Sequence, residues 1–139
     1  MPLGKEYTIL IDYAQCIYND ALYLIMGWDD NIFGASEKIY RIDLFNDRYD
    51  SQQISISNEG IADYTFGYDC KDNLVYLFGG DSDSGYFNNL SILDLSQQDL
   101  EFKVFNKAMN VPTARKGHAM EAYDDKLYIF GGVDADKKR

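Results

Sequence analysis

The chain has 139 residues, enough for one domain with a sizeable core, and its twelve Tyr and eight Phe favour a packed, strand-rich fold over disorder. Its net charge of −10 makes nucleic acid and anionic membranes poor partners, because both are negative, and favours a protein partner with a basic surface. The longest apolar run, Ala21 to Met26, is far shorter than the roughly 20 residues that span a bilayer, so no membrane association is expected.

Two features of the sequence bear on the compartment. Asp12 interrupts the apolar run from Tyr7 to Ile11, which argues against a cleaved signal peptide. The two cysteines, Cys16 and Cys70, show no metal-ligand spacing. The simplest interpretation is a cytoplasmic protein with reduced, buried thiols, and a disulfide between the two is the less favoured alternative.

The first unit of the chain, about residues 8–57, reads as four short strands. The polar turn Asn19-Asp20 precedes an apolar strand that contains Tyr23 and ends at Met26-Gly27. The third strand is the run Ile39 to Leu44, which matches Leu90 to Leu95 of the second unit.

The second unit repeats this plan. The predicted strands are Tyr64–Cys70, Leu74–Phe78, Asn89–Leu95 and Leu100–Phe105. The pair Gly79-Gly80 closes the second of these strands, and the loop Asp81 to Asn88 follows it.

The third unit supplies two strands, Gly117–Tyr123 and Lys126–Phe130, and Gly131-Gly132 is expected to close the second. Anchored on the second glycine, the three units lie 80 − 27 = 53 and 132 − 80 = 52 residues apart. A period near 50 residues with four strands per unit is typical of β-propeller blades.

The third unit also carries a family resemblance. Arg115-Lys-Gly-His118 followed by Leu127-Tyr-Ile-Phe-Gly-Gly132 resembles the kelch half-motif R-x-G-H … Y-x-x-G-G. Asn88 to Leu95 resembles the third kelch strand, and Pro112 to Arg115 the usual crossover. The resemblance implies an all-β fold of four-stranded antiparallel kelch-type blades that form an incomplete β-propeller.

On this interpretation residues 1–139 form a partial propeller. Blade 1 covers about 8–57, blade 2 about 62–106 and half of blade 3 about 114–132, and 133–139 is a tail. The motif positions with an expected structural role are Gly27, Gly79, Gly80, Gly131, Gly132, Tyr23, Tyr76, Tyr128 and His118.

The chain departs from the kelch pattern in places. Tyr13 and Phe66 stand at the positions equivalent to His118, and the Trp usual in the fourth strand is absent. Because propeller blades bury their faces against one another, two and a half blades need completion. Three alternatives remain: a truncated product of a longer gene, completion by copies of itself or a partner chain, and a compact stack that is no ring.

We expect a non-catalytic protein-interaction scaffold. Its contact surface is predicted in the loops Trp28 to Phe33 and Asp81 to Phe87 and in the crossovers Asn58 to Asp63 and Ala114 to Lys116. The candidate partner-binding residues are Trp28, Asp29, Asp30, Phe33, Asp81, Asp83, Tyr86, Phe87 and Arg115. Packing at the blade rim is the ordinary alternative for Trp28, and an inter-blade bond is the ordinary alternative for Arg115.

The sequence favours neither a metal nor a cofactor. Asp81-Ser-Asp-Ser-Gly85 hints at a calcium loop, but its glycine is one position early and Ile92 stands where an EF-hand needs Glu. Kelch-like copper oxidases need two His ligands, and His118 is the single His of this chain. The competing hypothesis is a propeller-based enzyme or small-molecule binder. It would resemble kelch propellers that isomerise sugars or the specifier proteins that steer plant glucosinolate breakdown, and further blades would complete its ring.

Overall fold

The structure is a computed structural model that describes residues 10–46, 48–53, 65–105 and 110–136, and all regular elements in these ranges are strands. The first sheet is antiparallel, and its spatial order β2-β3-β6-β7 follows the chain. Its strands are β2 (Ala14–Tyr18), β3 (Ala21–Ile25), β6 (Lys38–Asp43) and β7 (Tyr49–Gln53).

The second sheet repeats this architecture, in the spatial order β8-β9-β12-β13. Its strands are β8 (Gly67–Lys71), β9 (Leu74–Phe78), β12 (Leu90–Asp94) and β13 (Phe102–Phe105). The predicted all-β fold of four-stranded antiparallel sheets is therefore confirmed.

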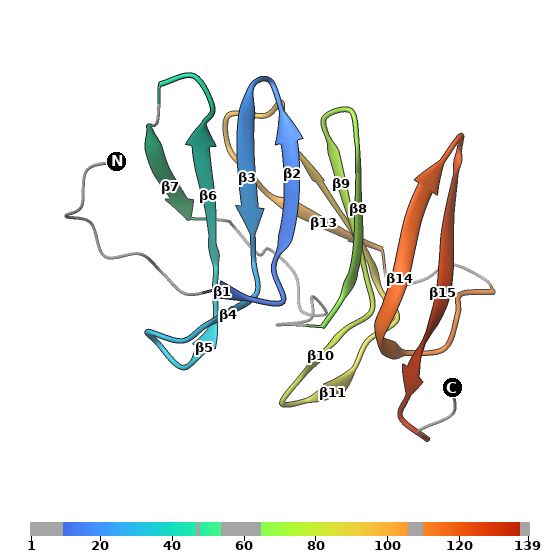
Figure 1. Cartoon of the computed structure of the whole chain (residues 1–139). Helices are drawn as coiled ribbons and strands as arrows, with labels where there is room; N and C mark the ends of the chain where they lie inside the picture. Colours follow the sequence, from blue (N-terminus) through green and yellow to red (C-terminus); the bar gives the residue numbers. More distant parts are fainter. Residues whose placement is uncertain (1–9, 47, 54–64, 106–109, 137–139) are drawn as a thin grey trace.

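A third element is the hairpin of β14 (Arg115–Tyr123) and β15 (Lys126–Asp134), which packs with β14 against β8. The first sheet, the second sheet and this hairpin stand side by side in chain order (Figure 1). Gly131 and Gly132 have positive φ angles of 73° and 84°, and β15 continues past them. Gly131 pairs with His118 and Val133 pairs with Lys116, so Gly132 and Gly117 form a local irregularity of the ladder between these two pairs. The glycine pair therefore lies inside the strand and does not end it.

Five short strands lie together at the lower end of the sheets in Figure 1. They are β1 (Leu10–Ile11), β4 (Trp28–Asp29), β5 (Gly34–Ala35), β10 (Asp81–Ser82) and β11 (Gly85–Tyr86). β4 pairs with β1 and β5, and β10 pairs with β11. The loops after the second strand of each sheet are therefore small hairpins, which the sequence pattern did not indicate.

The opposite end of the sheets carries tight turns. Asn19 and Asp20 connect β2 to β3 with φ angles of 47° and 59°, and Asn and Asp tolerate this left-handed region better than other non-glycine residues. The polar turns that mark the repeat in the sequence therefore bring the first two strands of a unit into register.

The core lies between the two four-stranded sheets. Ile25 on β3 and Val75 on β9 are fully buried there, together with Leu93 and Phe102 of the second sheet. Full burial of such side chains contributes about 1.5–3 kcal/mol each, so the two sheets stabilise one another.

Cys16 on β2 and Cys70 on β8 form a disulfide between the two sheets, with their Cα atoms 6.0 Å apart. The expectation of reduced thiols is therefore wrong. The two cysteines lie 54 residues apart in sequence, but their strands lie next to each other where the sheets pack.

Candidate interaction surface

The loop between β4 and β5 presents an apolar tip. Ile32 is 64% exposed and Phe33 is 81% exposed. Asp29, just before the tip, is buried, and its Oδ1 accepts a hydrogen bond from the backbone N–H of Asn31 at 2.9 Å. Asp29 therefore shapes the loop from inside, whereas Phe33 projects from it.

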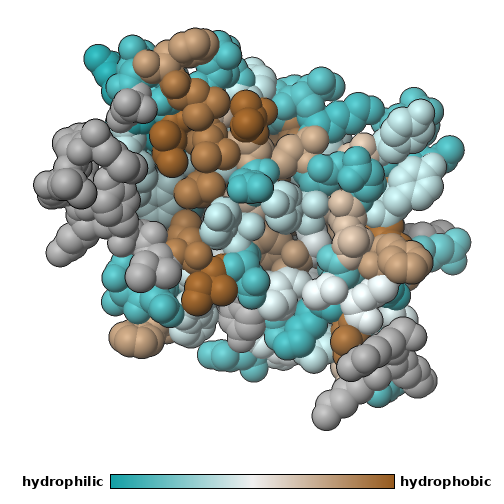
Figure 2. All heavy atoms as spheres, viewed as in Figure 1, coloured by the Kyte–Doolittle hydropathy of each residue, from teal (hydrophilic) through white to brown (hydrophobic). Residues whose placement is uncertain are grey.

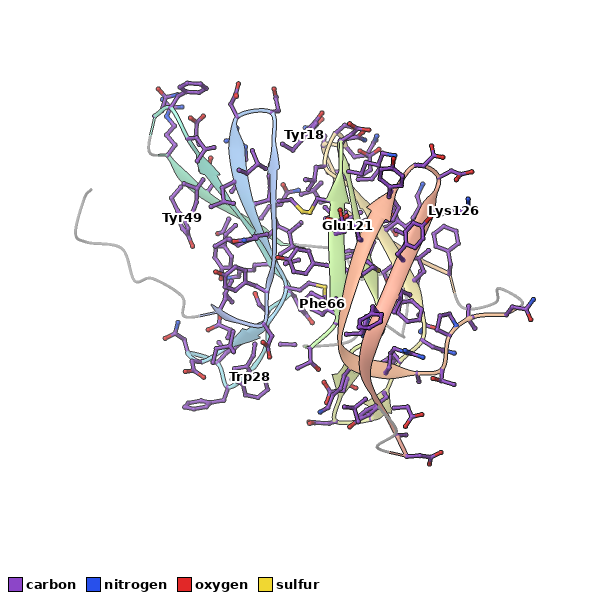
Figure 3. All side chains as sticks on the ribbon, turned by 45° about the vertical axis from the view of Figure 1, so that its right-hand side comes forward. Tyr18, Trp28, Tyr49, Phe66, Glu121 and Lys126 are labelled. Carbon is purple, nitrogen blue, oxygen red and sulfur yellow. A yellow bond between two sulfur atoms is a disulfide. The ribbon has the colours of Figure 1, made fainter. Side chains whose placement is uncertain are left out.

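Trp28 opens the same loop and is half-buried at the lower end of the first sheet (Figure 3). Its indole Nε1 donates a hydrogen bond to Oδ1 of Asp30 at 3.2 Å. This bond holds the exposed carboxylate of Asp30 beside the indole, so the loop combines an acidic group with aromatic surface.

The loop of β10 and β11 is joined to the next unit through Asp81. Its buried carboxylate accepts hydrogen bonds from the hydroxyl of Thr65 and from Nζ of Lys116, the latter at 2.5 Å. The same ammonium lies 5.1 Å from the centre of the Tyr86 ring. The hydrogen bond to Asp81 raises the pKa of Lys116, so its ammonium stays charged at neutral pH.

Two further residues of this loop differ in exposure. Phe87 is half-buried and packs against the core, whereas Asp83 is exposed at the tip, next to the hydrogen-bonded hydroxyls of Ser82 and Ser84. Asp83 is therefore the acidic group of this loop that faces outward.

The guanidinium of Arg115 is engaged within its own unit. Its Nη1 donates to the carbonyl of Gly131 at 3.0 Å, and its Nε donates to the carbonyl of Thr113 at 3.2 Å. The Arg115 backbone also joins the neighbouring loop, since its carbonyl accepts from Gly80 N–H at 2.8 Å and its N–H donates to the carbonyl of Phe87 at 3.1 Å. These contacts connect the second and third units.

His118 is buried between the second and third units. Its ring meets the Phe78 ring edge-on, with centroids 5.6 Å apart. Burial lowers the pKa of His118, and the positive charge of Arg115 lowers it further, so the imidazole is neutral at pH 7.

The remaining motif positions are the glycines at the ends of the apolar strands and the tyrosines within those strands. Gly79 and Gly132 have positive φ, and a Cβ on either would come within 2.5–2.7 Å of a carbonyl oxygen of the crossover, on Arg115 or Lys116. Gly27 and Gly80 share this backbone conformation. Burial of the motif tyrosines falls along the chain from Tyr23, which is buried, through Tyr76, which is half-buried, to Tyr128, which is exposed.

The structure thus divides the nine candidate partner-binding residues. Phe33, Asp30 and Asp83 are exposed at the loop tips, whereas Asp29, Asp81 and the guanidinium of Arg115 make contacts within the molecule. The other three, Trp28, Tyr86 and Phe87, are half-buried. The predicted crossover 58–63 lies outside the described residues.

The sequence analysis included Ile32 in a predicted contact loop without naming it as a candidate, and it missed the Asp81–Lys116 pair. An apolar Ile-Phe pair inside a polar loop is a signal that would have identified Ile32. No local signal identifies the ion pair, because its partners lie 35 residues apart.

Within the described ranges, no three or more His, Cys, Asp or Glu side chains come together in an arrangement that could hold a metal ion. The same ranges hold no helix of the length and apolarity needed to cross a membrane.

Comparison with known proteins matches residues 13–139 to the model of the KLHDC2/KLHL20/DRC7 Kelch-repeats domain. Kelch repeat-containing protein 2 of Saccharomyces cerevisiae is 39% identical over 61 residues, which cover 42% of this chain and 7% of that protein. Two Schizosaccharomyces pombe proteins are also similar. Tip elongation aberrant protein 1 is 38% identical over a segment that covers 47% of this chain and 6% of that protein. Tip elongation aberrant protein 3 is 30% identical over a segment that covers 71% of this chain and 9% of that protein. The chain therefore spans less than a tenth of these relatives.

Proposed function

Because the chain belongs to the kelch-repeat family, whose domains generally bind other proteins, we propose that it is a non-catalytic interaction module that binds a protein partner through its loop tips. The observation that carries the proposal is the exposure of Phe33 beside Ile32 at the end of the β4–β5 hairpin. Large aromatic side chains at the centre of an interface commonly supply much of its binding energy.

The charge of the loop tips supports a partner with a basic surface. Asp30 and Asp83 are the exposed carboxylates of the two neighbouring hairpins, and the whole chain carries a net charge of −10. Opposite charge on the partner would accelerate the encounter and orient it, while Phe33 would supply apolar contact.

The test compares two exposed phenylalanines at opposite ends of the first sheet. Phe33 and Phe45 are 81% and 77% exposed, and Phe45 lies in the turn between β6 and β7. Proteins cross-linked to the wild-type chain in cell extract are identified by mass spectrometry, and the strongest is purified and titrated against Phe33→Ala and Phe45→Ala. We expect Phe33→Ala to weaken binding by about tenfold or more and Phe45→Ala to leave it unchanged. Equal affinities for the two variants would contradict the proposal.

We also propose that another blade covers the exposed face of the β14–β15 hairpin, contributed by a longer form of this chain, by a second copy or by a partner chain. Phe130 on this face is 84% exposed, whereas the equivalent Phe78 and Ile25 are 3% and 0% exposed under the next unit. Figure 2 shows a band of hydrophobic residues along the first sheet, at the other end of the stack.

Light scattering over a range of protein concentrations tests self-association. A mass that rises above 15.9 kDa for the wild type and remains at this value for Phe130→Ser is the result expected for copies of the chain. A wild-type monomer at every concentration would contradict self-association.

The cytoplasmic setting, with or without cytoskeletal association, stays a proposal. It is supported by two relatives whose names refer to tip elongation. The disulfide of Cys16 and Cys70 weighs against it, since such bonds are rare in the reducing cytosol. Trapping the thiols with an alkylating reagent at lysis shows which redox state the cell maintains. Fully alkylated cysteines would agree with the cytosol, and protected cysteines would contradict it.

A further inference from the structure

A cavity of about 460 Å³ lies between the first and second sheets, away from the loop tips. Its apolar lining comes from both sheets: Tyr23 and Ile39 from the first, and Leu95 and Leu100 from the segment around the turn after β12. All four of these residues are buried. Both walls belong to the described blades, so the cavity needs no further blade to form.

The rim of the cavity is polar. Gln52 on β7 donates from its Nε2 to the carbonyl of Gln98 at 3.2 Å, which links the two sheets at the edge of the cavity. Arg41 and Asp50 lie directly opposite each other on β6 and β7 and also line the cavity. The cavity thus has an apolar floor and charged groups at its mouth, the usual composition of a binding pocket.

The lining holds one positive and one negative charge, on Arg41 and Asp50, and the carboxylate of Asp43 lies beside Arg41 just outside the lining. Arg41 is associated with Asp43 through Nη2 and Oδ2 at 3.8 Å, and the backbone N–H groups of Phe45 and Asn46 hydrogen-bond the same carboxylate. The exposed carboxylate of Asp50 has no hydrogen bond or ion pair within the described part of the chain. Asp50 is therefore available to a cation from outside.

We propose that this pocket binds the side chain of an arginine or lysine presented by a protein partner. The aliphatic stem would lie on Ile39, Leu95 and Leu100, and the cationic head would pair with Asp50 at the mouth. Long basic side chains commonly bury their stems and keep their charged ends near water, and a carboxylate forms strong charge-assisted hydrogen bonds with guanidinium or ammonium. The pocket volume falls in the range of small-ligand sites and accommodates one such side chain.

The pocket is separate from the proposed loop surface. It lies near the turns after β6 and β12, whereas the β4–β5 and β10–β11 hairpins lie at the other end of the sheets (Figure 1). Phe33 and Asp83 belong to these two hairpins. The two surfaces can therefore be tested independently, and failure of one leaves the other intact.

The experiment titrates the isotope-labelled chain with a capped Ala-Arg-Ala peptide and follows backbone amide shifts by NMR. The matched probe replaces arginine by citrulline, which has nearly the same shape and no charge. We expect the arginine peptide to shift the amides of residues 50–52 and 95–100, and the citrulline peptide to bind roughly tenfold more weakly. Shifts confined to other residues, or equal binding of the two peptides, would overturn the proposal.

Two variants complete the test. Asp50→Asn removes the carboxylate charge without changing the side-chain shape and should weaken the arginine peptide about tenfold. Asp83→Asn makes the same change in net charge at an exposed position at the other end of the molecule and should leave the affinity unchanged. Equal weakening by the two variants would show a general charge effect and no site.

Discussion

Cys16 on β2 and Cys70 on β8 form a disulfide at the position where the next pair of units has a hydrogen bond. There, Oδ2 of Asp69 on β8 accepts from the backbone N–H of Ala122 on β14 at 2.6 Å. Cys16 and Asp69 are equivalent, since 69 − 16 = 53 matches the repeat, and Cys70 and Ala122 are equivalent, since 122 − 70 = 52. One inter-blade contact is thus covalent at the first interface and polar at the second.

The first prediction concerns this disulfide. Replacing Cys16 and Cys70 together by Ser should lower the free energy of unfolding by about 4 kcal/mol, because the bond closes a loop of some 54 residues in the unfolded chain. Urea unfolding of the variant and of the wild type, each with and without reductant, measures the effect. Reductant should destabilise only the wild type. Identical midpoints for oxidised and reduced wild type would contradict the prediction.

The second prediction concerns Gly67, whose absent side chain leaves room for His118. A Cβ at Gly67 would come within 2.5 Å of Cδ2 of His118, so Gly67→Ala should cost about 1–3 kcal/mol through overpacking. Gly34→Ala is the matched control, because its Cβ would meet nothing closer than 3.9 Å and its φ is not in the left-handed region. Thermal unfolding compares the two variants. A Gly34→Ala variant as unstable as Gly67→Ala would show that the imidazole is not the cause.

The third prediction compares a partly buried ion pair with an exposed one. Lys116→Met leaves the buried carboxylate of Asp81 without its charged partner and should cost about 1–3 kcal/mol. Lys126→Met removes an ion pair with Asp125 that is 4.0 Å long and exposed, and should cost roughly 0–0.5 kcal/mol. Chemical unfolding of both variants in low and high salt gives the comparison. Equal losses would mean that Lys116 acts through its charge alone and not through its partner.

The fourth prediction concerns pH. Burial holds the pKa of His118 below its usual value of about 6.5, so the unfolded chain takes up a proton before the folded chain does. Stability should therefore be highest above pH 6.5 and should fall as the pH decreases below it, until the lowered pKa of the folded state is reached. Melting temperatures between pH 7.5 and 5 measure this dependence.

The control for the pH prediction is His118→Phe, since Phe66 occupies the equivalent position of the second unit. This variant should lose the dependence between pH 7.5 and 5. Asp43 and Asp94 also have lowered pKa values, from backbone and side-chain hydrogen bonds respectively. The stability that these two carboxylates contribute is complete above about pH 4 and is lost only below it, so it does not change between pH 7.5 and 5. An unchanged pH profile in His118→Phe would contradict the assignment.

The fold was largely predictable because its signal is periodic. The predicted strand Leu74–Phe78 coincides with β9, since an apolar run between a polar turn and a glycine pair has few alternatives. The two-residue strands β4 and β10 were missed, because two residues show no period.

The candidate site was less predictable because exposure depends on tertiary contacts. Asp81 and Asp83 lie in the same short polar loop, but Asp81 reaches Lys116 and Thr65 while Asp83 faces outward. The disulfide was hidden for a related reason. Cys16 and Cys70 take non-equivalent positions in the repeat, since Ile17 is the residue equivalent to Cys70. Neighbouring residues of a strand point to opposite faces, so one cysteine faces the following unit and the other the preceding one.

This front-to-back arrangement makes every interface in the stack heterologous. The forward face of one blade, with Cys16 or Asp69, meets the backward face of the next, with Cys70 or Ala122. Two such faces are left uncovered within the described residues: the forward face of the third unit, with Phe130, and the backward face of the first unit, with Ile17, which is 69% exposed. They are different surfaces, and each is one half of the contact that repeats between blades. A contact of this type has no two-fold axis. Its rotation per blade determines whether the assembly closes as a ring or continues as an open helix, and an isologous dimer, which pairs one face with the same face of its copy, does not reproduce this contact.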